Sequence, residues 1–214
     1  MSTVDLRSLF SAGMRRKYPR GQILLYQGEK SDSMYYIQKG HVKVYDITAQ
    51  GGEKLLLILG PGDMLPVIWT LNGVESLRYF YEAYTSTELI VLPNEALSGM
   101  VEPNHAATKL LLRYFADQMK DLMLRLDCIE SSSAKHKIGQ VLDYLARTHA
   151  VCQENVCKLR ISMTHQAIAD MAGVTRETAS LQLKDLENSG VIDPSGRKII
   201  IYKKELRDFL VESN

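Results

Sequence analysis

The stretch that decides the fold runs from Thr164 to Gly190 and reads THQAIADMAGVTRETASLQLKDLENSG. Apolar residues recur at helical spacing on both sides of Gly173, which predicts two short helices joined by a tight turn. Glycine suits that turn because it tolerates a positive φ and a close approach of two helices. Thr164 and Thr175 each stand where an N-cap is expected, so each helix has its own start signal.

The second helix, expected over residues 175–188, has two different faces. Ala179, Leu183 and Leu186 recur at intervals of four and three residues, which predicts a buried stripe. The opposite face is polar and mixed in charge, with Arg176, Glu177, Ser180 and Lys184. Such a face suits base edges and phosphates in a major groove. An ordinary helical hairpin with a solvated outer face is the alternative interpretation.

The residues that follow favour the DNA-binding interpretation. Val191-Ile192 indicates a short strand, Asp193 to Gly196 a turn, and Arg197 to Tyr202 (RKIIIY) a second strand. A helix-turn-helix followed at once by a hairpin is the order of a winged helix. We therefore assign residues 134–214 to a winged helix-turn-helix DNA-binding domain.

Two segments carry a resemblance to a known family. TRETASLQLKDLENSGVID…GRKIIIY (175–202) resembles the C-terminal domain of the Crp–Fnr family of bacterial transcription regulators. YPRGQILLYQGEKSDSMYYIQKGHVKVY (18–45) is similar to the first half of the cyclic-nucleotide-binding β-roll of the same family. The two segments follow the family's order, so the resemblance covers essentially the whole chain. It implies a homodimer that binds double-stranded DNA and acts with RNA polymerase.

The pattern of the first hundred residues also favours a roll on its own. Short apolar strands alternate with glycine turns, as at Gly28, Gly40 and Gly62, which is typical of an antiparallel roll or jelly roll. The predicted fold class is α+β. It comprises a jelly-roll-like, antiparallel sensor β-roll at 1–102, a dimerisation helix and hinge at 103–133, and the winged helix.

The segment between the two domains predicts one long helix, from Asn104 to about Ser131. Its apolar residues step by 4, 3, 4 and 3, which is a heptad seam. The seam consists of Phe115, Met119, Leu122, Leu126 and Ile129. In the family this helix is the dimer interface, which implies two recognition helices at half-sites one DNA turn apart. Three serines, 131–133, are expected to form the hinge.

The resemblance also assigns roles in DNA binding. Arg176, Glu177 and Ser180 match base-reading positions, where arginine would donate to guanine and glutamate would accept from cytosine. Phosphate contacts are implied for Thr164, His165, Gln166, Thr175, Thr178, Lys184 and Arg197. An exposed histidine without a contact is the alternative for His165. Leu181 stands where arginine is common in the family, and it either contacts a thymine methyl group or exchanges inside and outside roles with Gln182.

The ligand-binding segment of the roll departs from the family pattern. Members that bind cAMP carry a Gly-Glu pair, and later an arginine followed by serine or threonine, to hold the nucleotide. Here Pro66-Val67 stand in place of Gly-Glu, and Arg78 is followed by Tyr79. Proline lacks an amide donor, and valine lacks a carboxylate for a ribose hydroxyl. We therefore expect that the effector is not cAMP.

The rest of that segment is apolar and aromatic, which leaves several interpretations open. Its side chains either fill the interior of the roll, as apolar side chains usually do, or line a pocket for an uncharged effector. The candidate pocket residues are Met64, Leu65, Val67, Arg78 and Phe80. A constitutive regulator whose roll binds nothing is equally compatible with the altered segment.

Composition excludes some classes of protein. The chain has 214 residues and is 45% hydrophobic, which is typical of a globular protein. Its net charge of +1 does not by itself indicate a nucleic-acid binder. No apolar run reaches transmembrane length and no signal peptide is evident, so we expect no membrane partner and a cytoplasmic location.

The cysteines and histidines give little support to metal chemistry. We expect Cys128, Cys152 and Cys157 to be reduced structural thiols, with a Cys152–Cys157 pair or a redox-sensing cysteine as the alternative. A haem or redox sensor on the same scaffold, with His41 as a ligand, is a further alternative. A cupin-type enzyme needs a histidine cluster on the roll, but residues 1–102 contain only His41. We therefore predict no enzymatic activity, no metal and no cofactor.

Overall fold

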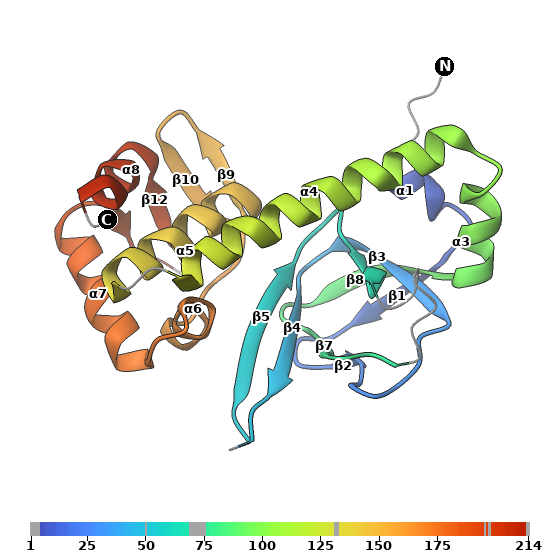
Figure 1. Cartoon of the computed structure of the whole chain (residues 1–214), viewed down its shortest axis with the longest axis horizontal. Helices are drawn as coiled ribbons and strands as arrows, with labels where there is room; N and C mark the ends of the chain where they lie inside the picture. Colours follow the sequence, from blue (N-terminus) through green and yellow to red (C-terminus); the bar gives the residue numbers. More distant parts are fainter. Residues whose placement is uncertain are drawn as a thin grey trace. The chain divides into compact units, whose positions relative to one another are not determined.

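The computed structural model describes residues 5–49, 51–68, 76–130, 133–194, 196 and 198–212. It divides the chain into two compact units, Met1–Asp117 and Gln118–Asn214. Most of the helices and strands are labelled in Figure 1. The first unit contains α1 (Leu6–Leu9), β1 (Met14–Tyr18), β2 (Ile23–Leu25), β3 (Ser33–Lys39), β4 (Val42–Ile47), β5 (Glu53–Leu59), β6 (Met64–Leu65), β7 (Phe80–Ala83), β8 (Thr87–Pro93), α3 (Asn94–Val101) and the start of α4 (His105–Glu130).

The strands of the first unit form two antiparallel sheets. Their orders are β1-β8-β3-β6 and β2-β7-β4-β5. One hydrophobic cluster lies between the sheets and takes Val44 and Tyr81 from one and Ile37 and Leu89 from the other. This arrangement confirms the predicted antiparallel roll and the α+β class.

A second cluster covers the other face of the first sheet. Strand residues such as Met34 and Leu92 pack there against Phe10, Leu97 and Leu111, which come from the helical segments. The buried hydroxyl of Tyr114 in α4 also accepts a hydrogen bond of 3.0 Å from the backbone N–H of Met64 in β6. The first half of α4 is therefore fixed to the roll by packing and by a buried hydrogen bond.

The second unit contains the remaining elements. After α4 they are α5 (Ala134–Thr148), β9 (Ala150–Gln153), β10 (Val156–Leu159), α6 (His165–Ala172), α7 (Arg176–Asn188), β11 (Ile192–Asp193), β12 (Ile200–Tyr202) and α8 (Lys203–Glu212). Their strands form one sheet in the order β11-β12-β10-β9. Ser133 caps α5 by accepting from the N–H of His136 at 3.4 Å. The other two serines of the predicted hinge lie outside the described residues.

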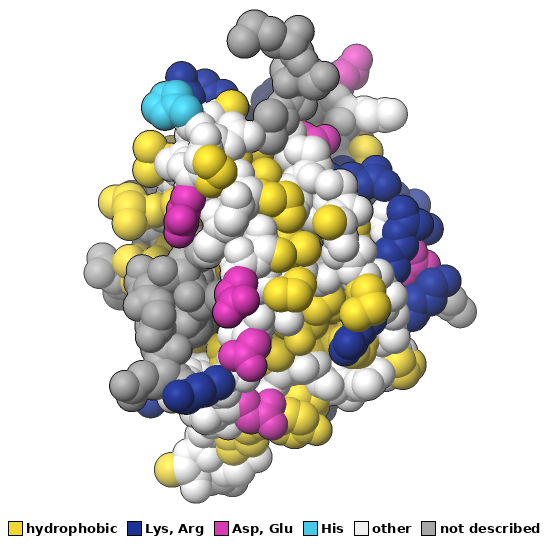
Figure 2. Space-filling model, turned by 90° about the vertical axis from the view of Figure 1, so that its right-hand side faces the viewer, with side chains coloured by type: hydrophobic (Ala, Val, Ile, Leu, Met, Phe, Trp, Pro, Cys, Tyr) yellow, Lys and Arg dark blue, Asp and Glu magenta, His cyan; other side chains and the backbone are white. Residues whose placement is uncertain are grey.

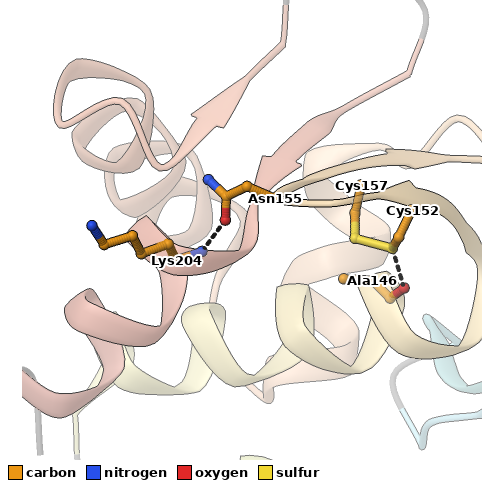
Figure 3. The surroundings of a disulfide bond; sticks show 5 residues. All are labelled: Ala146, Cys152, Asn155, Cys157 and Lys204. Atoms are coloured by element: carbon orange, nitrogen blue, oxygen red, sulfur yellow. Dashed lines mark hydrogen bonds between the residues drawn. A yellow bond between two sulfur atoms is a disulfide. The ribbon is translucent and has the colours of Figure 1, made fainter.

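The hairpin of β9 and β10 holds a disulfide between Cys152 and Cys157 (Figure 3). The expectation of reduced thiols is wrong for this pair. The antiparallel register places the two cysteines directly opposite each other, with their Cα atoms 4.1 Å apart, and the sequence alone does not give that register. The side chain of Cys128 lies outside the described part of the chain.

Asn155, in the turn of the same hairpin, forms hydrogen bonds with the first residues of α8. The side-chain oxygen of Asn155 accepts from the N–H of Lys204 at 2.6 Å (Figure 3), and its backbone carbonyl accepts from Lys203 at 2.8 Å. Its amide nitrogen donates to the carboxylate of Glu205 at 2.7 Å. This hydrogen bond holds the pKa of the Glu205 carboxyl below its ordinary value.

Candidate nucleic-acid interface

The helix-turn-helix is built as its sequence predicts. Thr164 caps α6 by accepting a 3.0 Å hydrogen bond from the N–H of Ala167, and Ile168 and Ala169 are buried. The helix ends at Gly173, whose φ of 64° is in the left-handed region. The predicted N-cap, apolar stripe and turn glycine are therefore confirmed.

The helix α7 presents a polar face outward. Thr175 caps it by accepting from the N–H of Thr178 at 3.2 Å, while Ala179, Leu183 and Leu186 form the predicted buried stripe. Arg176 and Glu177 are exposed in the first turn, and within the described residues neither makes an ion pair. Both side chains are therefore available to an external partner.

The structure excludes one of the two interpretations of Leu181. Its side chain is 67% exposed, whereas Gln182 is half-buried. The two residues have therefore not exchanged inside and outside roles. Leu181 lies on the outer surface of α7, where an apolar side chain can meet a thymine methyl group.

The predicted phosphate contacts lie around the starts of both helices. Thr164, His165, Gln166, Thr175 and Lys184 are exposed, Thr178 is half-buried, and Arg197 lies outside the described residues. The first backbone N–H groups of a helix lack intrahelical partners and point outward, which favours anions there. Exposed hydroxyl and amide side chains therefore accompany two helix starts suited to phosphate oxygens.

Besides the capping hydroxyls, Gln166 and Lys184 also have partners on their own helices. The Gln166 amide donates to Asp170 at 2.7 Å, and the Lys184 ammonium pairs with Glu187 at 2.9 Å. The Lys184–Glu187 pair is exposed, so it is worth little and can be replaced by a phosphate contact.

One contact in this region was not foreseen from the sequence. Nδ1 of His165, at the start of α6, lies 2.9 Å from Oγ of Ser180 in α7. These two residues are 15 positions apart, and periodicity within either helix carries no information about contacts between helices. The packing of the two helices brings a predicted phosphate contact and a predicted base contact together.

Overall charge does not mark the interface, which agrees with the net charge of +1. Figure 2, which views the molecule from the right-hand side of Figure 1, shows Asp and Glu side chains among hydrophobic ones and several Lys and Arg side chains along one edge, but this view is not centred on the helix-turn-helix. The candidate DNA-binding residues are therefore recognised by their place on the helix-turn-helix and not by the net charge of the chain.

The five candidate effector residues do not lie in one place. Met64 and Val67 belong to the cluster beneath the helices, whereas Leu65 belongs to the cluster between the sheets. Arg78 is exposed, and Phe80 stacks on Tyr45 with ring centroids 5.3 Å apart. The structure therefore does not bring these five residues together, and core packing accounts for Met64 and Leu65.

The predicted seam of α4 is open to solvent. Met119, Leu122 and Leu126 are 66%, 50% and 52% exposed, and Phe115 is half-buried. Leu112 and Met123 widen this apolar surface, and the side chain of Ile129 lies outside the description. A helix of 26 residues thus carries an apolar stripe that the described residues of the chain leave exposed.

None of the helices in the described part of the chain is long and apolar enough to cross a membrane. Among those same residues, no group of three or more His, Cys, Asp or Glu side chains is placed to hold a metal ion.

Comparison with known proteins gives matches over both units. Residues 15–104 match the model of the cyclic nucleotide-binding domain, and residues 137–209 match that of the Crp-like helix-turn-helix domain. The global nitrogen regulator of Nostoc sp. is 24% identical over 187 residues, which cover 87% of this chain and 84% of that protein. The cAMP-activated global transcriptional regulator CRP of Salmonella typhimurium is 26% identical over 186 residues, covering 87% and 88%.

The solved structure of FixK2 from Bradyrhizobium japonicum has the same fold. It superposes with a TM-score of 0.77 at 20% identity, covering 92% of this chain and 96% of that one. The two matched domains and their order define the class, which is a transcription regulator with a DNA-binding helix-turn-helix domain. The chain belongs to the Crp–Fnr family. Its relatives are regulators rather than enzymes, which agrees with the prediction that it is not an enzyme.

Proposed function

We propose that the protein is a homodimeric, sequence-specific transcription regulator that reads a palindromic DNA site with α7. The observation that carries this proposal is the structure of α7. Thr175 caps this helix, one side of it is a buried apolar stripe, and the opposite side is polar and faces outward. Arg176 and Glu177 stand exposed in its first turn, where side chains of a recognition helix reach base edges. Arg176 is suited to guanine through two hydrogen bonds, and Glu177 to the amino group of cytosine.

The proposed dimer interface is the seam of α4. Phe115 and the exposed Met119, Leu122 and Leu126 step by 4, 3 and 4, so a second copy of the same helix can bury these side chains in knobs-into-holes packing. A two-fold dimer would present two copies of α7 and would therefore read two half-sites about one DNA turn apart. RNA polymerase is the further partner that we propose for a regulator of this class.

The proposed effector, if the roll takes one, is not cAMP. Pro66 and Val67 replace the Gly-Glu pair of family members that bind cAMP, and Arg78 is exposed and followed by tyrosine. A constitutive regulator would bind its DNA site without a ligand, whereas a regulator with an uncharged effector would change its DNA affinity when the effector binds. A ligand shifts the equilibrium only if it binds one state of the protein better than the other.

The experiment that tests the proposal is selection of randomised duplex DNA by the purified chain, without an added ligand. Recovery of a palindrome with half-sites one helical turn apart would support a dimeric reader that is already in its binding form. Weak, sequence-independent binding would mean that a ligand is missing.

A substitution in α7 then tests the assignment of the recognition helix. On the selected site, Arg176→Ala should lose about 1–3 kcal/mol of binding free energy and relax the preference at one base position in each half-site. Arg207→Ala is the matched control, because it removes an exposed arginine of the same unit from α8. Equal affinities for Arg176→Ala and the native chain would refute the assignment of α7.

A further inference from the structure

The hydrogen bond between His165 and Ser180 joins two residues with different predicted roles in DNA binding. His165 is the first residue of α6, at a phosphate-contacting position, and Ser180 lies at a base-reading position of α7. Nδ1 of the ring lies 2.9 Å from the serine Oγ. His165 is exposed and Ser180 is half-buried, so both can be reached from outside.

The chemistry of the ring links the two roles. In a neutral imidazole one nitrogen donates a hydrogen bond and the other accepts one. A phosphate oxygen only accepts, so a neutral His165 that contacts phosphate through Nε2 carries its proton there. Its Nδ1 is then an acceptor, and the hydroxyl of Ser180 must donate to it across the 2.9 Å contact.

The direction of this hydrogen bond limits what Ser180 can read. A serine hydroxyl has one proton and two lone pairs. Once the proton is directed at His165, Ser180 can only accept a hydrogen bond from DNA. In the major groove the base donors are the amino groups of adenine and cytosine, whereas guanine and thymine present acceptors.

We propose that His165 is a positioning residue that makes Ser180 select an amino-bearing base, adenine or cytosine, in each half-site. This inference rests on the proposed function, because it requires α7 to lie in the major groove. Two polar neighbours are bonded elsewhere, Gln166 to Asp170 and Lys184 to Glu187, so neither pair draws the serine hydroxyl away from the ring.

The experiment uses the full chain and its selected DNA site at pH 8, above the range in which histidine side chains are usually charged. Each base pair of a half-site is replaced in turn, and affinities are measured for the native chain, Ser180→Ala, His165→Ala and Gln166→Ala. One position should prefer adenine or cytosine. There the base is also replaced by an analogue without the amino group, purine for adenine or 2-pyrimidinone for cytosine.

We expect the native chain to bind the analogue about 2- to 10-fold more weakly, which is the range for one neutral hydrogen bond. Ser180→Ala should be insensitive to the analogue, and this comparison also corrects for any effect on the duplex itself. His165→Ala should weaken binding to all sites and should also reduce the preference at that one position, because the freed hydroxyl can then donate or accept. Gln166→Ala, the matched control, should weaken all sites without changing any preference.

Two results would overturn the inference. One is an unchanged base preference in His165→Ala, and the other is a preference for guanine or thymine at the position that responds to Ser180→Ala. Failure of the proposed function gives a different result. In that case Arg176→Ala would leave the affinity for every sequence unchanged.

Discussion

Truncation of two leucines in the seam of α4 should separate the proposed dimer into folded monomers. Leu122 and Leu126 are 50% and 52% exposed in the single chain, so a partner helix can bury about half of each side chain. Complete burial of a leucine is worth about 1.5–3 kcal/mol, so each half is worth about 1 kcal/mol. In a two-fold interface each substitution occurs once in each copy. The double variant Leu122→Ala with Leu126→Ala should therefore lose about 4 kcal/mol of dimerisation free energy.

That loss corresponds to a dimer dissociation constant about a thousandfold higher than in the native chain. Sedimentation equilibrium measures the constant directly. Affinity for the full palindrome should fall, while affinity for a single half-site should stay the same, because α7 is untouched. Val211→Ala is the control, because it truncates a side chain that is 76% exposed on another helix.

A loss of folding would imitate dissociation, so thermal unfolding of the double variant is followed at the same concentrations. The substituted side chains are half-exposed in the monomer, and the monomer should therefore remain folded. An unchanged dissociation constant in a folded variant would refute the reasoning. The apolar stripe would then not be the contact between two copies.

Two further predictions concern the β9–β10 hairpin. Replacing both Cys152 and Cys157 by serine should lower the free energy of unfolding by about 2 kcal/mol, the chain-entropy value for so short a loop, and urea denaturation with and without reductant measures it. Asn155→Ala should raise the pKa of Glu205 toward its ordinary value, as followed by NMR titration, and an unchanged titration would contradict the assigned cause. Because the folded pKa of Glu205 is depressed, this contact stabilises the fold above the ordinary carboxyl pKa and is lost as pH falls through the folded value.

Features set by neighbouring residues could be predicted from the sequence. Thr164 and Thr175 act as N-caps because a capping hydroxyl bonds an N–H only three residues away. Gly173 adopts the left-handed conformation that a tight turn requires. The seam of α4 is likewise a matter of spacing within one helix. These features depend on residues that are close in the sequence, so they can be predicted without knowledge of the tertiary structure.

Features that depend on register or on packing between elements could not be predicted in the same way. Met64 and Leu65 are neighbours in one strand, so their side chains point to opposite faces of the sheet and enter different clusters. A run of apolar residues that could have lined one pocket therefore contributes to two separate cores. The opposition of Cys152 and Cys157 depends on a hairpin register that begins at its turn.

The same distinction explains why the sequence predicts which residues of α7 face outward more readily than it predicts the base that each of them would select. The type of each side chain on α7 follows from the sequence, and an arginine is suited to guanine wherever it stands in the groove. A serine has no such fixed preference, because its hydroxyl can donate or accept. For Ser180 we propose that the tautomer of His165, which begins another helix and lies 2.9 Å away, makes this choice. On this proposal, the base preference at that position depends on how α6 and α7 pack together, and the sequence of α7 alone does not determine it.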